Sequence, residues 1–105
     1  MIRVDFYYED KELCGFHIHG HSEYADPGKD IVCSAISALS FNCVNSLEVL
    51  SKDRTSVEQE SNGNLFCIVK RPISPEGQLL LRSLQLGAEN IAKEYPRYVT
   101  ISTKE

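Results

Sequence analysis

The chain has 105 residues, of which 42% are hydrophobic and 25% are charged, and it carries a formal net charge of −4 at pH 7. These values are typical of a soluble globular protein and predict a single domain over residues 1–105. They argue against direct nucleic-acid binding, which usually needs a broad basic face, and we expect no apolar run long enough to span a bilayer.

Two alternating segments open the chain and predict an antiparallel hairpin. In each segment every second residue is apolar, as in a strand with one buried face. The apolar positions are Ile2, Val4, Phe6 and Tyr8 in the first segment, and Cys14, Phe16 and Ile18 in the second. The polar residues 9–11 between them supply the turn.

The apolar period changes at Asp30 and predicts a long amphipathic helix. Apolar residues now recur at steps of three and four, which is the spacing of a buried helical stripe. The stripe consists of Val32, Ile36, Leu39, Cys43, Leu47 and Leu50. We expect Asp30 to be the N-cap of this helix, Asp26-Pro27-Gly28 to form a turn in the preceding loop, and the polar residues 51–54 to end it.

The second half of the chain predicts a hairpin, a helix and a last strand. Residues 55–60 are polar and suit an edge strand, Asn62-Gly63 is a strong hairpin turn signal, and residues 65–70 form a more hydrophobic strand. Ser74 and Pro75 are typical of a helix start. The stripe of this helix is Leu80, Leu84, Ala88, Ile91 and Tyr95, and the last strand covers residues 98–102. The order β-β-α-β-β-α-β predicts an α+β fold: an antiparallel β-sheet with two α-helices packed on one face.

The cysteines and the N-terminus indicate the compartment. The four cysteines show no Cys-x-x-Cys pair and no zinc-ribbon spacing, and the polar and apolar alternation of the N-terminus is unlike a signal peptide. Without an export signal we expect a cytoplasmic protein with reduced thiols and no membrane partner. Because four is an even number, a disulfide reading remains open.

Cys33 and His21 are the candidate catalytic residues. A helix capped by Asp30 places Cys33 at its third position, where the positive end of the helix dipole favours the nucleophilic thiolate. His21 follows Gly20 at a strand end, and the loop between them can return its imidazole to the sulfur as a general base. The pair predicts nucleophilic catalysis, whereas Cys33 on its own could equally be a small buried residue.

A second histidine pattern leaves a metal site open. His17, His19 and His21 form a His-x-His-x-His motif, which on a straight strand would share one face, and imidazole is a common zinc ligand. No fourth ligand stands at a recognisable spacing, and Gly20 can end the strand before His21. We therefore expect no metal and no cofactor, with His17 and His19 on a solvated strand face.

The run from Gly20 to Leu39 resembles the signature of the ribosomal-processing cysteine proteases, the Prp family. That signature is a Gly-His pair, a short loop with a glycine, and then Asp-Ile-Val-Cys-(Ala/Ser)-Ala-(Val/Ile)-Ser, and this chain carries Gly20-His21 and the matching residues 30–37. The resemblance covers the whole chain in length and element order. It implies that His21 and Cys33 form a catalytic dyad.

The resemblance also implies a substrate and an assembly. The family removes the N-terminal extension of a bacterial large-subunit ribosomal protein, number twenty-seven, and is typically a homodimer. Its substrates carry a hydrophobic, aromatic-containing stretch before the cut and a basic segment after it. Around the dyad we expect substrate-binding or supporting roles for Gly20, Glu23, Asp26, Asp30 and Ser34, with the acids Glu23 and Asp26 attracting the basic segment.

Two other interpretations stay open at this point. One is a ribosome-associated binding module without catalysis, in which Cys33 is structural. The other is a histidine-bound metal protein. Thiol reactivity tests the first and metal analysis tests the second.

Overall fold

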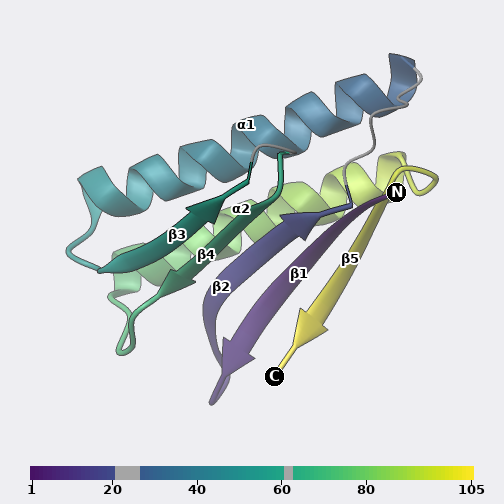
Figure 1. Cartoon of the computed structure of the whole chain (residues 1–105). Helices are drawn as coiled ribbons and strands as arrows, with labels where there is room; N and C mark the ends of the chain where they lie inside the picture. Colours follow the sequence, from purple (N-terminus) through teal and green to yellow (C-terminus); the bar gives the residue numbers. More distant parts are fainter. Residues whose placement is uncertain (21–26, 61–62) are drawn as a thin grey trace.

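The described part of the chain forms five strands and two helices in the predicted order. We analysed a computed structural model that describes residues 1–20, 27–60 and 63–105. The elements are β1 (Ile2–Glu9), β2 (Glu12–His19), α1 (Pro27–Leu50), β3 (Thr55–Gln59), β4 (Leu65–Val69), α2 (Pro75–Glu94) and β5 (Val99–Lys104). Figure 1 shows the two helices side by side on one face of the sheet, so the predicted α+β layers are confirmed.

The sheet is mixed rather than fully antiparallel. Its strand order is β3-β4-β2-β1-β5, and β5 runs parallel to β1 while the other neighbouring pairs are antiparallel. The reason lies in α2, whose 20 residues carry the chain about 30 Å at 1.5 Å per residue. This length returns the chain to the end of the sheet where β1 begins (Figure 1), so β5 starts beside β1 and runs in the same direction.

The hydrophobic core lies between the sheet and the helices. Its buried residues come from β1, β2, β4, β5 and both helices, and include Phe6, Phe16, Ile36, Leu47, Cys67, Leu81 and Val99. Strand β3 contributes none of the buried members and stands at one end of the strand order. The prediction of a polar edge strand there is confirmed.

The start of α1 differs from the prediction. The helix begins at Pro27, three residues before the expected cap, so Pro27 and Gly28 are helical rather than part of a turn. Proline suits this place because the first helical residue needs no N–H partner and its φ is already helical. Asp30 is therefore not the N-cap but an acidic residue of the first turn, where a negative charge meets the positive end of the helix dipole.

Both helical stripes differ in detail from the predicted ones. In α1, Leu50 is 65% exposed, while Ser40 is buried and donates its hydroxyl hydrogen to the Ile36 carbonyl over 2.6 Å. In α2, Leu81 rather than Leu80 is fully buried, and Tyr95 lies past the last helical residue. Apolar residues also flank each stripe, so the sequence does not distinguish the buried position from its apolar neighbour.

The start of α2 is confirmed and carries a second cap. Pro75 is the first helical residue, and the Ser74 hydroxyl oxygen accepts a hydrogen bond of 3.0 Å from the Gly77 N–H. The Asp53 carboxylate accepts bonds from the Ser74 N–H at 2.9 Å and from its hydroxyl at 2.5 Å. Asp53 thus ties the end of the α1–β3 connection to the first turn of α2.

Helix α1 passes a simple test for a membrane span, contrary to our expectation. The 21 residues from Asp30 to Leu50 are long and apolar enough by length and composition. In the fold, however, this helix sends Val32, Ile36 and Leu47 into the same core as the sheet. A core helix of a globular domain passes the same test, so the measure is weak evidence for a span.

Candidate active site

Cys33 lies one helical turn further into α1 than predicted. It is the seventh residue of a helix that begins at Pro27, and it is half-buried against the hydrophobic core. The expected position at the third residue is therefore wrong. The dipole effect fades within the first turn, so the helix start contributes less to the thiolate than the sequence suggested.

The backbone around Cys33 changes with this shift. The unpaired N–H groups of a helix belong to its first four positions, and Cys33 lies beyond them. Its own N–H therefore cannot serve as an unpaired donor. The unpaired donors of the first turn of α1 are the backbone N–H groups of Gly28 and Lys29, since Pro27 has no N–H.

The four cysteines differ in burial, and Cys33 is the accessible one. All four are thiols, and Cys14, Cys43 and Cys67 are buried whereas Cys33 is intermediate. Burial raises the pKa of the Cys43 thiol to about 12 and that of the Cys67 thiol to about 11. Burial also raises the pKa of the Cys14 thiol. Because the thiolate is the nucleophile, these three side chains are poor candidates near neutral pH.

The histidine and two acids of the predicted site lie outside the described residues. His21, Glu23 and Asp26 all belong to the segment 21–26, which the structure does not describe. The structure does place both ends of this segment: β2 ends and α1 begins at the same end of the molecule (Figure 1). Asp30 and Ser34, on the helical side, are both exposed.

Gly20 stands where β2 gives way to this segment, and its backbone requires glycine. Its φ is +86°, in the left-handed region that L side chains rarely adopt. A Cβ placed on it would lie 2.5 Å from the Met1 carbonyl oxygen. The residue directly before His21 is thus held against the N-terminal strand in a conformation that other residues resist.

A second cluster of functional groups lies on the sheet face away from the helices. Asp5 pairs directly with His17 across β1 and β2, and His19 Nε2 lies 2.8 Å from Asp5 Oδ2. The two imidazoles stack, with ring centroids 4.3 Å apart. One nitrogen or carboxylate oxygen from each of the three residues lies within 4.8 Å of the others. The sequence pattern indicated the two histidines but not Asp5, because the pairing of β1 with β2 brings that residue to them.

The charges of this cluster follow from its contacts. Burial pushes the pKa of Asp5 upward, but hydrogen bonds from Ser102 and His19 and the nearby Lys104 outweigh it, and the net pKa is lowered. Burial lowers the pKa of His17, and the neighbouring His19 lowers it further. At neutral pH Asp5 is therefore a carboxylate and His17 a neutral imidazole. His17 and His19 lie on the face that the helices leave open, as expected, but both rings are half-buried rather than fully solvated.

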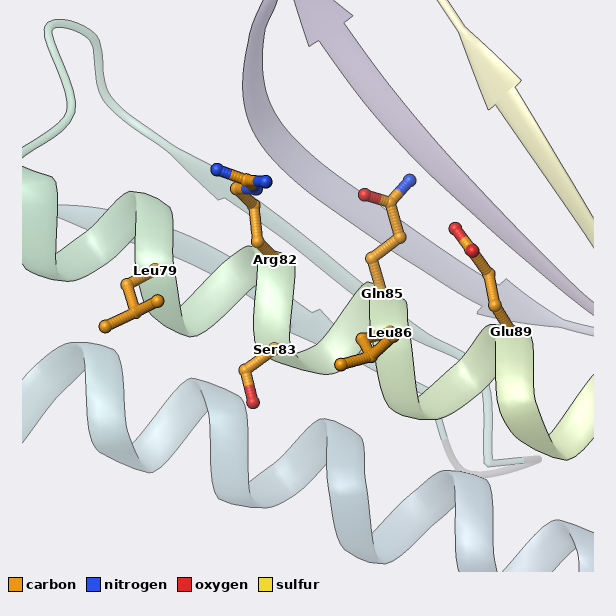
Figure 2. A pocket seen from close by; sticks show the side chains of 6 residues that line it. All are labelled: Leu79, Arg82, Ser83, Gln85, Leu86 and Glu89. Atoms are coloured by element: carbon orange, nitrogen blue, oxygen red, sulfur yellow. The ribbon is translucent and has the colours of Figure 1, made fainter.

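A groove along α2 is the other notable surface feature. Figure 2 shows its lining on one exposed side of the helix, and Leu79 and Leu86 there are 69% and 62% exposed. The lining consists of Leu79, Arg82, Ser83, Gln85, Leu86 and Glu89. It contains no nucleophile–base pair and no residue of α1, so it is separate from the Cys33 site.

Comparison with known proteins decides the family. The sequence profile described as "Cysteine protease Prp" matches residues 1–100. The chain belongs to the Prp family of cysteine proteases. The expectation of a peptide-bond hydrolase is thereby confirmed. The family match does not favour the alternative interpretation, a binding module without catalysis.

Individual relatives and solved structures match over nearly their whole length. The ribosomal processing cysteine protease Prp of Staphylococcus aureus strain Mu50 is 29% identical over 106 residues, covering 99% of this chain and 100% of the relative. A Streptococcus mutans crystal structure superposes with a TM-score of 0.85 at 32% identity, covering 100% of this chain and 96% of that one. The S. aureus Prp crystal structure with a covalently linked product peptide superposes with a TM-score of 0.89 at 27% identity, covering 99% and 100%.

Proposed function

We propose that this Prp protease removes the N-terminal extension of large-subunit ribosomal protein number twenty-seven, using Cys33 as nucleophile and His21 as its base. The observation that carries the proposal is the placement of Cys33. Of the four cysteines, Cys33 is half-buried whereas the other three are buried. It lies near the start of α1 and follows the segment that contains His21. The match to the Prp profile spans this whole region.

The chemistry follows from the two side chains. His21 accepts the thiol proton, and the Cys33 sulfur attacks the scissile carbonyl carbon to form a tetrahedral oxyanion. As the oxyanion collapses, the carbon–nitrogen bond breaks and protonated His21 gives its proton to the leaving amine. Water, deprotonated by His21, then attacks the thioester, the carbon–sulfur bond breaks, and the extension leaves as a carboxylic acid while protonated His21 returns a proton to the Cys33 thiolate.

The oxyanion needs hydrogen-bond donors near the sulfur. A helical side chain covers the turn on the N-terminal side of its own Cα, so the Cys33 sulfur lies over the first turn of α1. We assign the donors to the N–H groups of Gly28 and Lys29 in that turn, since the Cys33 N–H lies too deep in the helix.

Substrate binding and assembly complete the proposal. The acids Glu23 and Asp26 attract the basic segment that follows the cut, while Gly20 and the exposed residues Asp30 and Ser34 border the site. We further expect a cytoplasmic homodimer whose cleavage reaction needs no cofactor, in keeping with the resemblance. A molar mass measured in solution tests the dimer.

Peptide cleavage with matched variants tests the proposal. A peptide spanning the extension and the first mature residues is incubated with wild type, Cys33→Ser and His21→Ala, and the products are identified by mass spectrometry. Wild type should cut at one bond, and both variants should fall to about a thousandth of its kcat or below. Cys14→Ser is the matched control, because a serine hydroxyl can keep the hydrogen bond that the Cys14 thiol donates to the Tyr7 carbonyl.

Different outcomes of this experiment test the nucleophile, the substrate and the acidic residues separately. Cleavage by Cys33→Ser at the wild-type rate would overturn the nucleophile, whereas loss of activity in Cys14→Ser would point to a general structural effect. A wild-type enzyme that leaves this peptide intact but cuts another ribosomal peptide would overturn the substrate alone. Glu23→Gln together with Asp26→Asn should raise KM for the basic peptide, and an unchanged kcat/KM would remove their assigned role.

A further inference from the structure

We propose that Asp5, His17 and His19 form a binding site for a divalent metal ion of the zinc class on the sheet face that the helices leave open. Nothing in the protease mechanism uses these three residues. They come from two neighbouring strands, so a rigid part of the fold holds them. The proposal stands independently of the proposed substrate and of the Cys33 chemistry.

Strand geometry brings the three ligands together. His17 and His19 are two residues apart on β2 and therefore project from the same face, and Asp5 is the direct partner of His17 on β1. Their candidate ligand atoms lie within 4.8 Å of one another, and the closest pair, His19 Nε2 and Asp5 Oδ2, is 2.8 Å apart. Zinc bonds of about 2.1 Å in a tetrahedron put ligand atoms roughly 3.4 Å apart. Small rotations of two half-buried rings supply that adjustment.

The surroundings of Asp5 resemble those of a metal ligand whose carboxylate is held in place by a second hydrogen bond. Its side chain is buried, and the Ser102 hydroxyl donates a hydrogen bond to Oδ1, which leaves Oδ2 directed at the histidines. Hydrogen bonds of this kind fix ligating carboxylates in metal sites. Lys104 Nζ is 3.9 Å from Oδ2, and because its side chain is 55% exposed it can move into solvent when a cation enters.

A purely structural link between β1 and β2 does not require two stacked imidazoles. One hydrogen bond between Asp5 and His19 already ties β1 to β2. His17 adds a second ring that stacks on His19 and meets Phe66 edge-on at 5.3 Å between centroids. Two imidazoles and one carboxylate are the donor set that catalytic zinc sites use, with water at the fourth position.

Calorimetric titration with Zn²⁺ tests the site. The full chain is used with Cys33→Ser, so that the accessible thiol cannot bind the metal, and is first treated with a chelator. We expect one Zn²⁺ per chain, with affinity falling at least tenfold in His17→Gln and in His19→Gln. Glu58→Gln is the matched control. Glu58 is an exposed acid on β3 that pairs with Phe66 of β4, and this variant should bind Zn²⁺ as the parent does.

Thermal unfolding with and without Zn²⁺ guards against variants that merely fold poorly. Zn²⁺ should raise the Tm of the parent, because it binds the folded state, and should leave the Tm of His17→Gln unchanged. Equal Zn²⁺ affinity in the parent and both histidine variants would overturn the proposal, as would a parent whose Tm does not respond. Unchanged Zn²⁺ affinity in Asp5→Asn would overturn the Asp5 assignment.

Discussion

Replacing Gly20 by alanine should damage catalysis more than stability. Gly20 has a φ of +86°, and its new Cβ would lie 2.5 Å from the Met1 carbonyl oxygen. The next residue is His21, the proposed base. Any movement that relieves the contact therefore also moves the start of the segment that carries the imidazole.

The expected size of the effect follows from these two observations. A left-handed backbone costs an alanine about 1–2 kcal/mol, which lowers the Tm of a chain of this size by roughly 5–15 °C. A carbon–oxygen contact relaxes to about 3.3 Å, so the backbone at residue 20 must shift by roughly 0.8 Å. Misplacement of a catalytic group by about 1 Å can cost about a hundredfold in rate. We expect kcat/KM to fall by about 10- to 100-fold.

A matched variant separates strain from misplacement. Gly63 in the β3–β4 connection has a φ of +93°, so Gly63→Ala carries the same kind of backbone penalty in a different part of the fold. Urea unfolding should show similar losses for both variants, whereas peptide cleavage well below either Tm should be impaired in Gly20→Ala alone. Equal kcat/KM values for the two variants would refute the reasoning.

Three other outcomes are expected. Gly77→Ala should lower the free energy of unfolding by about 1–3 kcal/mol, although alanine is the better helix former, because its Cβ would overlap Asp53 Oδ2. Unchanged urea unfolding would contradict this. Burial pushes the pKa of Asp53 up, but hydrogen bonds from two serines outweigh it and lower the pKa, so its stabilisation should be complete above about pH 4 and lost as the pH falls through the lowered pKa. Asp53→Asn should accordingly flatten the acid side of the stability–pH curve, and an unaltered curve would exclude this role. Iodoacetamide at neutral pH should label Cys33 in the folded protein while Cys43 and Cys67 stay unlabelled, since burial holds their pKa values near 12 and 11; equal labelling rates, read by peptide mapping, would count against it.

Local patterns in the sequence were enough to predict the elements and their order. Alternation gave β1 and β2, Ser74-Pro75 gave the start of α2, and the polar composition of residues 55–59 gave the edge strand. Each of these signals depends on neighbours within a few residues. The strand direction of β5 does not, because it depends on how far α2 carries the chain before β5 begins.

The site was predictable to a different degree. The motif indicated Cys33, and its half-buried place on α1 agrees with that choice. The helix start was placed wrongly because Asp30 is a good cap residue, while Pro27 is equally suited to the first helical position. Asp5 was missed altogether, since its approach to His17 and His19 follows from the pairing register of two strands.

The parallel pairing of β1 with β5 has a consequence for when this protein can fold during its synthesis. The first strand lies between β2 and the last six-residue strand, and the Ile2 N–H donates to the Tyr98 carbonyl at 2.8 Å. Contacts between opposite ends of a chain form late, because the intervening loop must close first. We therefore expect the sheet to close only once β5 has left the exit tunnel, so β1 keeps one unpaired edge until all five strands have been synthesised.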